Sequence, residues 1–77
     1  MDTYTKVRER LLSLCKEKGM NVNNLAVRAE LPPSTVKNII YGKSKNPGVV
    51  TLKMLCDGLG VTLSEFFETS DFNNCDN

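Results

Sequence analysis

The sequence contains no histidine, and no apolar run in it exceeds three residues. A membrane-spanning helix needs about 20 apolar residues, so no membrane segment is predicted. Charged residues occur throughout the first 20 positions, which leaves no apolar stretch for a secretory signal. The three cysteines, Cys15, Cys56 and Cys75, form no Cys-x-x-Cys pair. Neither a zinc site nor a disulfide framework is expected, and a cytoplasmic protein without metal or cofactor is predicted.

The absence of histidine also weighs against an enzyme. No histidine base is available to activate a serine or cysteine nucleophile. The acidic residues are scattered, and no glycine-rich phosphate loop precedes a helical pattern. With 77 residues, the chain is long enough for one domain at most, which leaves no room for a separate ligand-sensing domain. Neither catalysis nor a small-molecule ligand is therefore expected.

Acidic residues are missing from the middle of the chain. The net charge is only +1, but residues 1–53 hold all ten Lys and Arg and only four acids, a net charge of +6. Residues 54–77 hold five acids and no base, a net charge of −5. No acid occurs between Glu30 and Asp57, a span that includes four lysines. This asymmetry indicates an interaction surface that the total charge conceals.

Apolar residues recur at helical spacing in five short stretches. The first covers residues 4–18, and the others are marked by the apolar positions of Val22–Ala29, Val36–Ile40, Leu52–Leu59 and Leu63–Phe67. Residues that start or end helices separate them, namely Gly19, Asn21, Pro33, Gly42, Gly60 and the Thr62–Glu65 capping box. No extended alternation of apolar and polar residues predicts a sheet. The sequence therefore predicts an all-α, compact five-helix bundle over residues 1–68 and a flexible, polar and acidic tail over residues 69–77.

The second and third helical stretches are separated only by residues 30–33. Two short helices joined so tightly must cross at a steep angle, which is the geometry of a helix-turn-helix. Ala26 is expected at their closest approach, with Val36 and Ile39 packed beneath it. The third helix then has an outward face without acids, formed by Pro33, Ser34, Lys37, Asn38 and Tyr41.

The chemistry of this outward face suits double-stranded DNA. Asn38 can form a bidentate pair with adenine, and Lys37 can donate to guanine or to a phosphate. Ser34 and Thr35 lie in the first helical turn, where side chains reach base edges and backbone N–H groups point at phosphates. In the polar loop beyond the helix, Lys43 and Lys45 are positioned to hold the flanking DNA backbone.

On these residues the chain resembles the phage repressor/Cro-type, or XRE-like, helix-turn-helix family. The resemblance covers residues 21–67 and is carried by the segments 21–29, 31–36, 42–47 and 59–66. It implies a lambda-repressor-like domain that regulates transcription by binding operator DNA, usually as a homodimer. By the same resemblance, the base readers are Pro33, Ser34, Lys37 and Asn38. The phosphate contacts come from Asn21, Tyr41, Lys43 and Lys45, together with the start of the second helix.

Three positions depart from the pattern of the family. Glu30 stands in the turn where the family usually has glycine, so a positive φ there would be strained. Val22 replaces a glutamine that often donates to phosphate at the start of the second helix. Pro33 offers only apolar contact at the first base-reading position. The resemblance therefore predicts that phosphate affinity rests more on the lysines than is usual.

Other interpretations of the same residues remain open from the sequence. The lysines are compatible with an ordinary solvated surface, and Tyr41 with packing on the third helix instead of a phosphate contact. Phe66 and Phe67 both fit the core. If the core is too small to cover both rings, the ring left exposed predicts a dimer interface. The alternative function is an antitoxin or other protein-interaction module of the same fold, which masks an unknown protein partner. The third possible interpretation is a structural helical bundle without affinity for DNA.

Overall fold

The computed structural model describes residues 2–69, and over that range the chain forms five α-helices and no strand. The helices are α1 (Thr3–Glu17), α2 (Val22–Ala29), α3 (Pro33–Ile40), α4 (Val49–Leu59) and α5 (Leu63–Phe67). The predicted all-α, five-helix class is therefore confirmed. Residues 70–77, which include Cys75 and most of the expected flexible tail, lie outside the described residues.

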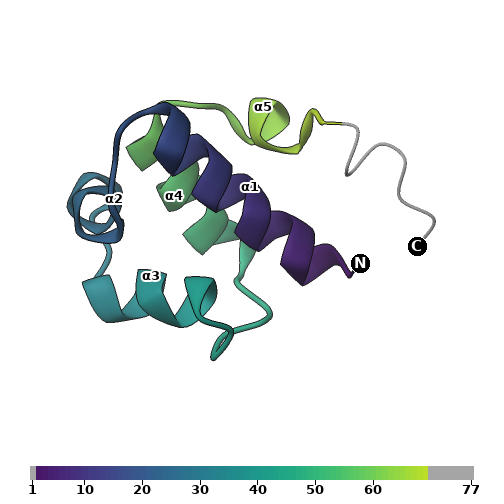
Figure 1. The fold of residues 1–77 in the computed structure, drawn as a ribbon, viewed down its shortest axis with the longest axis horizontal. Coiled ribbons are helices and arrows are strands. Elements are labelled where there is room, and N and C mark those ends of the chain that lie inside the picture. The colour runs from purple at the N-terminus through teal and green to yellow at the C-terminus, as the bar shows by residue number, and fades with distance from the viewer. Residues whose placement is uncertain (1, 70–77) are drawn as a thin grey trace.

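The five helices pack around one apolar centre. In Figure 1, α1 crosses diagonally in front of α4, with α2 and α3 on one side of the pair and α5 above it. α2 packs against both α4 and α3, and α1 also touches α3. The helix-turn-helix pair therefore rests on α4 and α1, which together determine how α3 is presented.

Local capping chemistry places most of the helix ends where the sequence predicts them. Asn21 caps α2 through a reciprocal pair with Asn24, and Thr62 caps α5 through a reciprocal pair with Glu65. The Asp2 carboxylate accepts a hydrogen bond of 2.8 Å from the Thr5 amide. This unpredicted cap begins α1 at Thr3, one residue earlier than expected, and α1 also ends one residue earlier, at Glu17.

The core consists entirely of apolar side chains within the described part of the chain. Its buried members are Val7, Leu11, Leu14, Cys15, Leu25, Ala26, Ala29, Val36, Ile39, Ile40, Leu55, Cys56, Leu59 and Phe66. Burial raises the pKa of the Cys15 and Cys56 thiols, so both act as small apolar side chains, as predicted. Across residues 2–69, no helix has the length and apolar character that crossing a membrane requires.

Candidate nucleic-acid interface

The turn between α2 and α3 has a left-handed residue at its centre. Glu30 has φ 58° and ψ 38°, and the Leu31 amide donates to the Ala26 carbonyl over 3.0 Å. This hydrogen bond closes the end of α2 in the manner of a Schellman motif, in which glycine normally occupies the left-handed position. The turn therefore has the backbone conformation that glycine adopts easily, and Glu30 adopts it under strain.

Small residues allow α2 to approach its neighbours closely. Ala26 and Val36 have no exposed surface, as expected for the α2–α3 crossing. On the other side of α2, a Cβ atom added to Gly58 of α4 would lie 2.9 Å from the backbone nitrogen of Ala29. Only glycine fits at position 58. The signal in the sequence is a glycine inside a helical pattern, which often marks a close approach of two backbones.

α3 presents one face to solvent, and most of the expected site residues lie on it. Pro33, Ser34, Lys37 and Asn38 are exposed on α3, and Tyr41, directly after the helix, is 68% exposed. Helical spacing at positions 34, 37, 38 and 41 brings these side chains onto one stripe. The structure therefore gathers on one surface Tyr41 and the four exposed residues of α3 that the sequence assigned to DNA contact.

Thr35 differs from the expectation for the first turn of α3. Its side chain is half-buried, and its backbone amide donates to the Pro32 carbonyl over 3.0 Å. That amide is occupied within the protein and does not point freely at a phosphate. Any contribution of Thr35 to binding therefore comes from its hydroxyl group.

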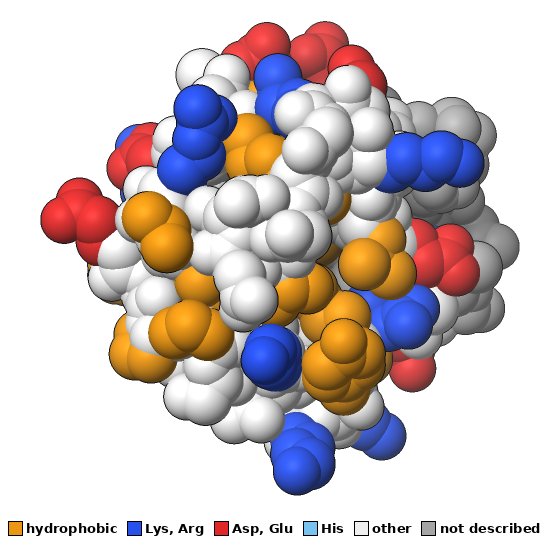
Figure 2. All heavy atoms as spheres, turned by 60° about the vertical axis from the view of Figure 1, so that its left-hand side comes forward, with side chains coloured by type: hydrophobic (Ala, Val, Ile, Leu, Met, Phe, Trp, Pro, Cys, Tyr) orange, Lys and Arg blue, Asp and Glu red, His pale blue; other side chains and the backbone are white. Residues whose placement is uncertain are grey.

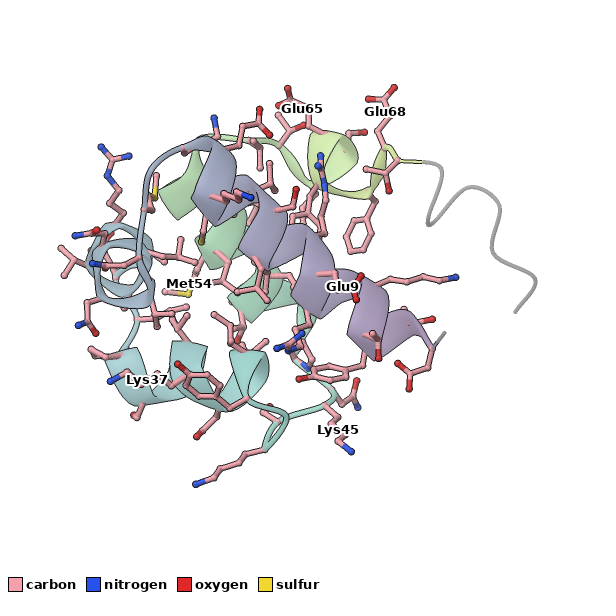
Figure 3. The ribbon with its side chains drawn as sticks, viewed as in Figure 1. Glu9, Lys37, Lys45, Met54, Glu65 and Glu68 are labelled. Atoms are coloured by element: carbon pink, nitrogen blue, oxygen red, sulfur yellow. The ribbon has the colours of Figure 1, made fainter. Side chains whose placement is uncertain are left out.

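The loop after α3 is fixed to the helix itself. The amides of Lys43 and Ser44 both donate to the Asn38 carbonyl, each over 2.9 Å. The side chains of Lys43 and Lys45 are exposed. In Figure 3, Lys37 on α3 and Lys45 in the loop lie at one end of the molecule, and Glu65 and Glu68 lie at the opposite end. These two lysines and two glutamates are thus separated in space as well as along the chain.

Several of the other cations are already engaged within the fold. Arg8 donates to the Ile40 carbonyl, and Arg10 donates to the Phe66 and Glu65 carbonyls at 2.8 Å each. Lys53 forms a surface ion pair with Asp57. The side of the molecule that carries α2 and α3 has acids only around its margin in Figure 2. Lys37, Lys43 and Lys45 supply the positive charge of α3 and of the loop that follows it.

At the start of α2, Asn21 combines capping with exposure. Its side-chain oxygen accepts from the Asn24 amide over 2.8 Å, and its own amide donates to the Asn24 side chain over 3.1 Å. The predicted capping role is confirmed. Because the cap uses the side-chain oxygen, the NH₂ group of this exposed asparagine is the part that suits a phosphate.

The two aromatic residues expected at a dimer seam have different environments. Phe66 is fully buried and Phe67 is half-buried, with their rings edge to face at 4.9 Å. Only Phe67 therefore offers surface to a second chain. The large apolar side chains most exposed among the described residues lie elsewhere, at Val27, Tyr41, Val49 and Val50.

Comparisons with known proteins agree with this geometry. The family model of the Cro/C1-type HTH DNA-binding domain matches residues 10–71. The crystal structure of the prophage Lp1 protein 11 superposes with a TM-score of 0.81 at 30% sequence identity, covering 94% of this chain and 95% of that chain. No curated protein gives a significant match.

Proposed function

The chain belongs to the Cro/C1-type helix-turn-helix family and is a DNA-binding regulator, and from that premise we propose that it reads a specific operator with α3. The observation that carries the proposal is the exposed, acid-free face of α3, in which Lys37 and Asn38 stand side by side. An asparagine and a lysine on a helix of this motif are suited to base edges in the major groove.

In this proposal the site divides into base readers and phosphate contacts. Pro33, Ser34, Lys37 and Asn38 meet base edges, with Pro33 contributing apolar contact only. The phosphate contacts come from Asn21, the Thr35 hydroxyl, Tyr41, Lys43 and Lys45. Exposure supports these assignments for every member except Thr35, which is half-buried.

We further propose that residues 1–68 form the DNA-binding unit, that residues 69–77 are an acidic tail, and that two copies bind a pseudo-palindromic site. Half-sites read by paired domains of this kind lie about 34 Å apart, one turn of DNA. The separation of Glu65 and Glu68 from Lys37 and Lys45 in Figure 3 supports DNA approaching from the α3 side.

The experiment is selection of duplexes from a randomised pool, followed by binding of the selected and a scrambled duplex over a range of salt concentrations. We expect a recurring inverted repeat, tight binding of the selected duplex and a linear fall of log affinity with log salt. Lys45→Ala should weaken both duplexes alike and reduce the salt slope by about 1. Lys53→Ala is the control, because Asp57 already pairs with that charge. Recovery of no common sequence would contradict the proposal.

A further inference from the structure

The carbonyl groups at the C-terminal end of α3 accept hydrogen bonds from two different parts of the chain. The last four carbonyls of an α-helix lack partners within the helix and must find them elsewhere. In α3 these belong to residues 37–40. The Lys37 carbonyl accepts from the Tyr41 amide over 2.8 Å, and the Asn38 carbonyl accepts from Lys43 and Ser44. The chain that follows α3 therefore satisfies the first two of the four.

The other two carbonyls are satisfied by α1, which is distant in the sequence. The Tyr4 hydroxyl donates to the Ile39 carbonyl over 2.5 Å, and the Arg8 Nε donates to the Ile40 carbonyl over 2.6 Å. Tyr4 and Arg8 are four residues apart and so lie on the same face of α1. The positive charge of Arg8 also complements the negative end of the α3 dipole. Both side chains are half-buried.

The same tyrosine lies beside the start of the basic loop. A Cβ atom on Gly42 would be 3.7 Å from the Tyr4 hydroxyl oxygen. Tyr4 therefore borders both the last turn of α3 and the chain leading to Lys43. The hydrogen bonds from α1 end on the carbonyls of the last turn of α3, the turn that also contains Asn38. The Asn38 carbonyl in turn accepts from the Lys43 and Ser44 amides, so the start of the basic loop is attached to the same turn.

The exact position of the last turn of α3 matters for base reading. α3 has eight residues, and isolated helices shorter than about 12 residues are marginal in water, so its last turn depends on tertiary contacts. Base reading requires donors and acceptors to meet within a few tenths of an ångström. Phosphate contacts from long lysine side chains tolerate larger displacements.

We propose that Tyr4 and Arg8 are positioning residues for sequence reading: they hold the last turn of α3 and, through it, Asn38 and the basic loop. The inference rests on the proposed function and adds that discrimination between DNA sequences depends on α1. Loss of either hydrogen bond leaves the chain folded and still attracted to DNA, but lowers its preference for the selected duplex.

The test is the ratio of affinities for the selected and the scrambled duplex in Tyr4→Phe. This variant keeps the ring and all charges, so the salt slope should not change. We expect the ratio to fall about threefold to tenfold, the equivalent of one hydrogen bond, with affinity for the scrambled duplex unchanged. Arg8→Lys, which keeps the charge but loses the Nε donor, should lower the ratio as well. A ratio equal to that of the original protein in Tyr4→Phe would overturn the proposal.

Arg10→Gln is the matched control for loss of stability alone. Arg10 makes the same kind of contact as Arg8, but at the end of α5. We expect this variant to unfold more easily and to keep its affinity ratio, because a uniform change in attraction cancels in the ratio. An equal fall of the ratio in Arg10→Gln would show a general effect of destabilisation and would also overturn the proposal.

A measurement without DNA separates this inference from the proposed function. Amide hydrogen exchange at Lys43 and Ser44 reports whether the loop still binds the Asn38 carbonyl. Tyr4→Phe should speed exchange at both amides, and Arg10→Gln should not. If the original protein selects no DNA sequence, the proposed function fails, and this exchange alone decides whether α1 holds the end of α3. Unchanged exchange in Tyr4→Phe would contradict the inference.

Discussion

The backbone and the side chain of Asn38 have separate roles: the backbone holds the loop, and the side chain is proposed to read bases. Its backbone carbonyl accepts from Lys43 and Ser44, while its side chain is exposed. Replacement of the side chain therefore leaves the loop attachment intact, since that attachment involves only backbone atoms. This makes Asn38 a suitable position at which to separate base reading from folding.

We expect Asn38→Ala to lose about 1–3 kcal/mol of binding free energy on the selected duplex, because a bidentate contact to adenine is lost. Affinity for the scrambled duplex should change little. Asn23→Ala, which alters an exposed asparagine on α2, is the control and should preserve the difference between the duplexes. Fluorescence anisotropy titrations measure both. Equal loss on the two duplexes would show that Asn38 does not read bases.

Glu30 is the one non-glycine residue with positive φ among the described residues. Glycine adopts this conformation without steric penalty, so Glu30→Gly should raise the free energy of unfolding by about 1 kcal/mol. Glu30→Gln keeps the backbone strain and removes only the charge. Urea unfolding of the three proteins is the measurement. Equal stabilisation by both substitutions would mean that the charge, not the backbone, accounts for the gain.

At the scale of elements, the starts and ends of helices were predictable because their chemistry is local. Asn21, Pro33 and the Thr62–Glu65 pair act within three or four residues of their own positions. The contacts of α1 with α3 and α5 were not predictable, because they join residues 32 to 56 positions apart. Nothing in the local sequence distinguishes Arg8 or Arg10 from arginines that face solvent or DNA.

The exposed face of α3 was predictable for a similar reason. Its residues follow helical spacing, and the buried partners Val36 and Ile39 determine which side faces out. Two features were not predictable: that Thr35 is half-buried, and that of the two phenylalanines Phe66 is the one that is fully buried. Both depend on how neighbouring elements cover a position, which periodicity alone does not specify.

The close packing of α2 against α4 depends on Gly58. We expect Gly58→Ala to lower the free energy of unfolding by about 1–3 kcal/mol, because the new methyl group would meet backbone atoms of Ala29. That loss outweighs the gain of up to about 1 kcal/mol from the helix propensity of alanine. Gly48→Ala is the control, since nothing lies within 4 Å of an added Cβ there. Thermal unfolding measures both variants. A Gly58→Ala protein that is as stable as the original would contradict this packing.

The cap of α5 makes part of the stability depend on pH. Hydrogen bonds from the Thr62 backbone and side chain lower the pKa of Glu65 below its ordinary value of 4.5. A lowered pKa in the folded state means that the contribution is present above pH 4.5 and is lost as the pH falls through the folded pKa. Glu65→Gln still accepts the hydrogen bond and should lose less stability between neutral and acidic pH. Equal acid sensitivity of the two proteins in urea unfolding would exclude this role for Glu65.

At the scale of the whole molecule, the small net charge conceals two different ends. Lys37 and Lys45 lie at one end, and Glu65 and Glu68 lie at the other (Figure 3). Exposed charges of one sign attract a polyanion from the side on which they gather. The same arrangement orients the proposed complex, with α5 directed away from DNA.

The central claim is that the exposed face of α3 meets DNA, and a nuclear magnetic resonance titration with the selected duplex tests it most directly. Backbone amide shifts are followed while the duplex is added, with the scrambled duplex in parallel. The account predicts that the largest changes fall on residues 33–45 and at Asn21, while α5 changes little. Changes centred on α5, or none at either duplex, would contradict it.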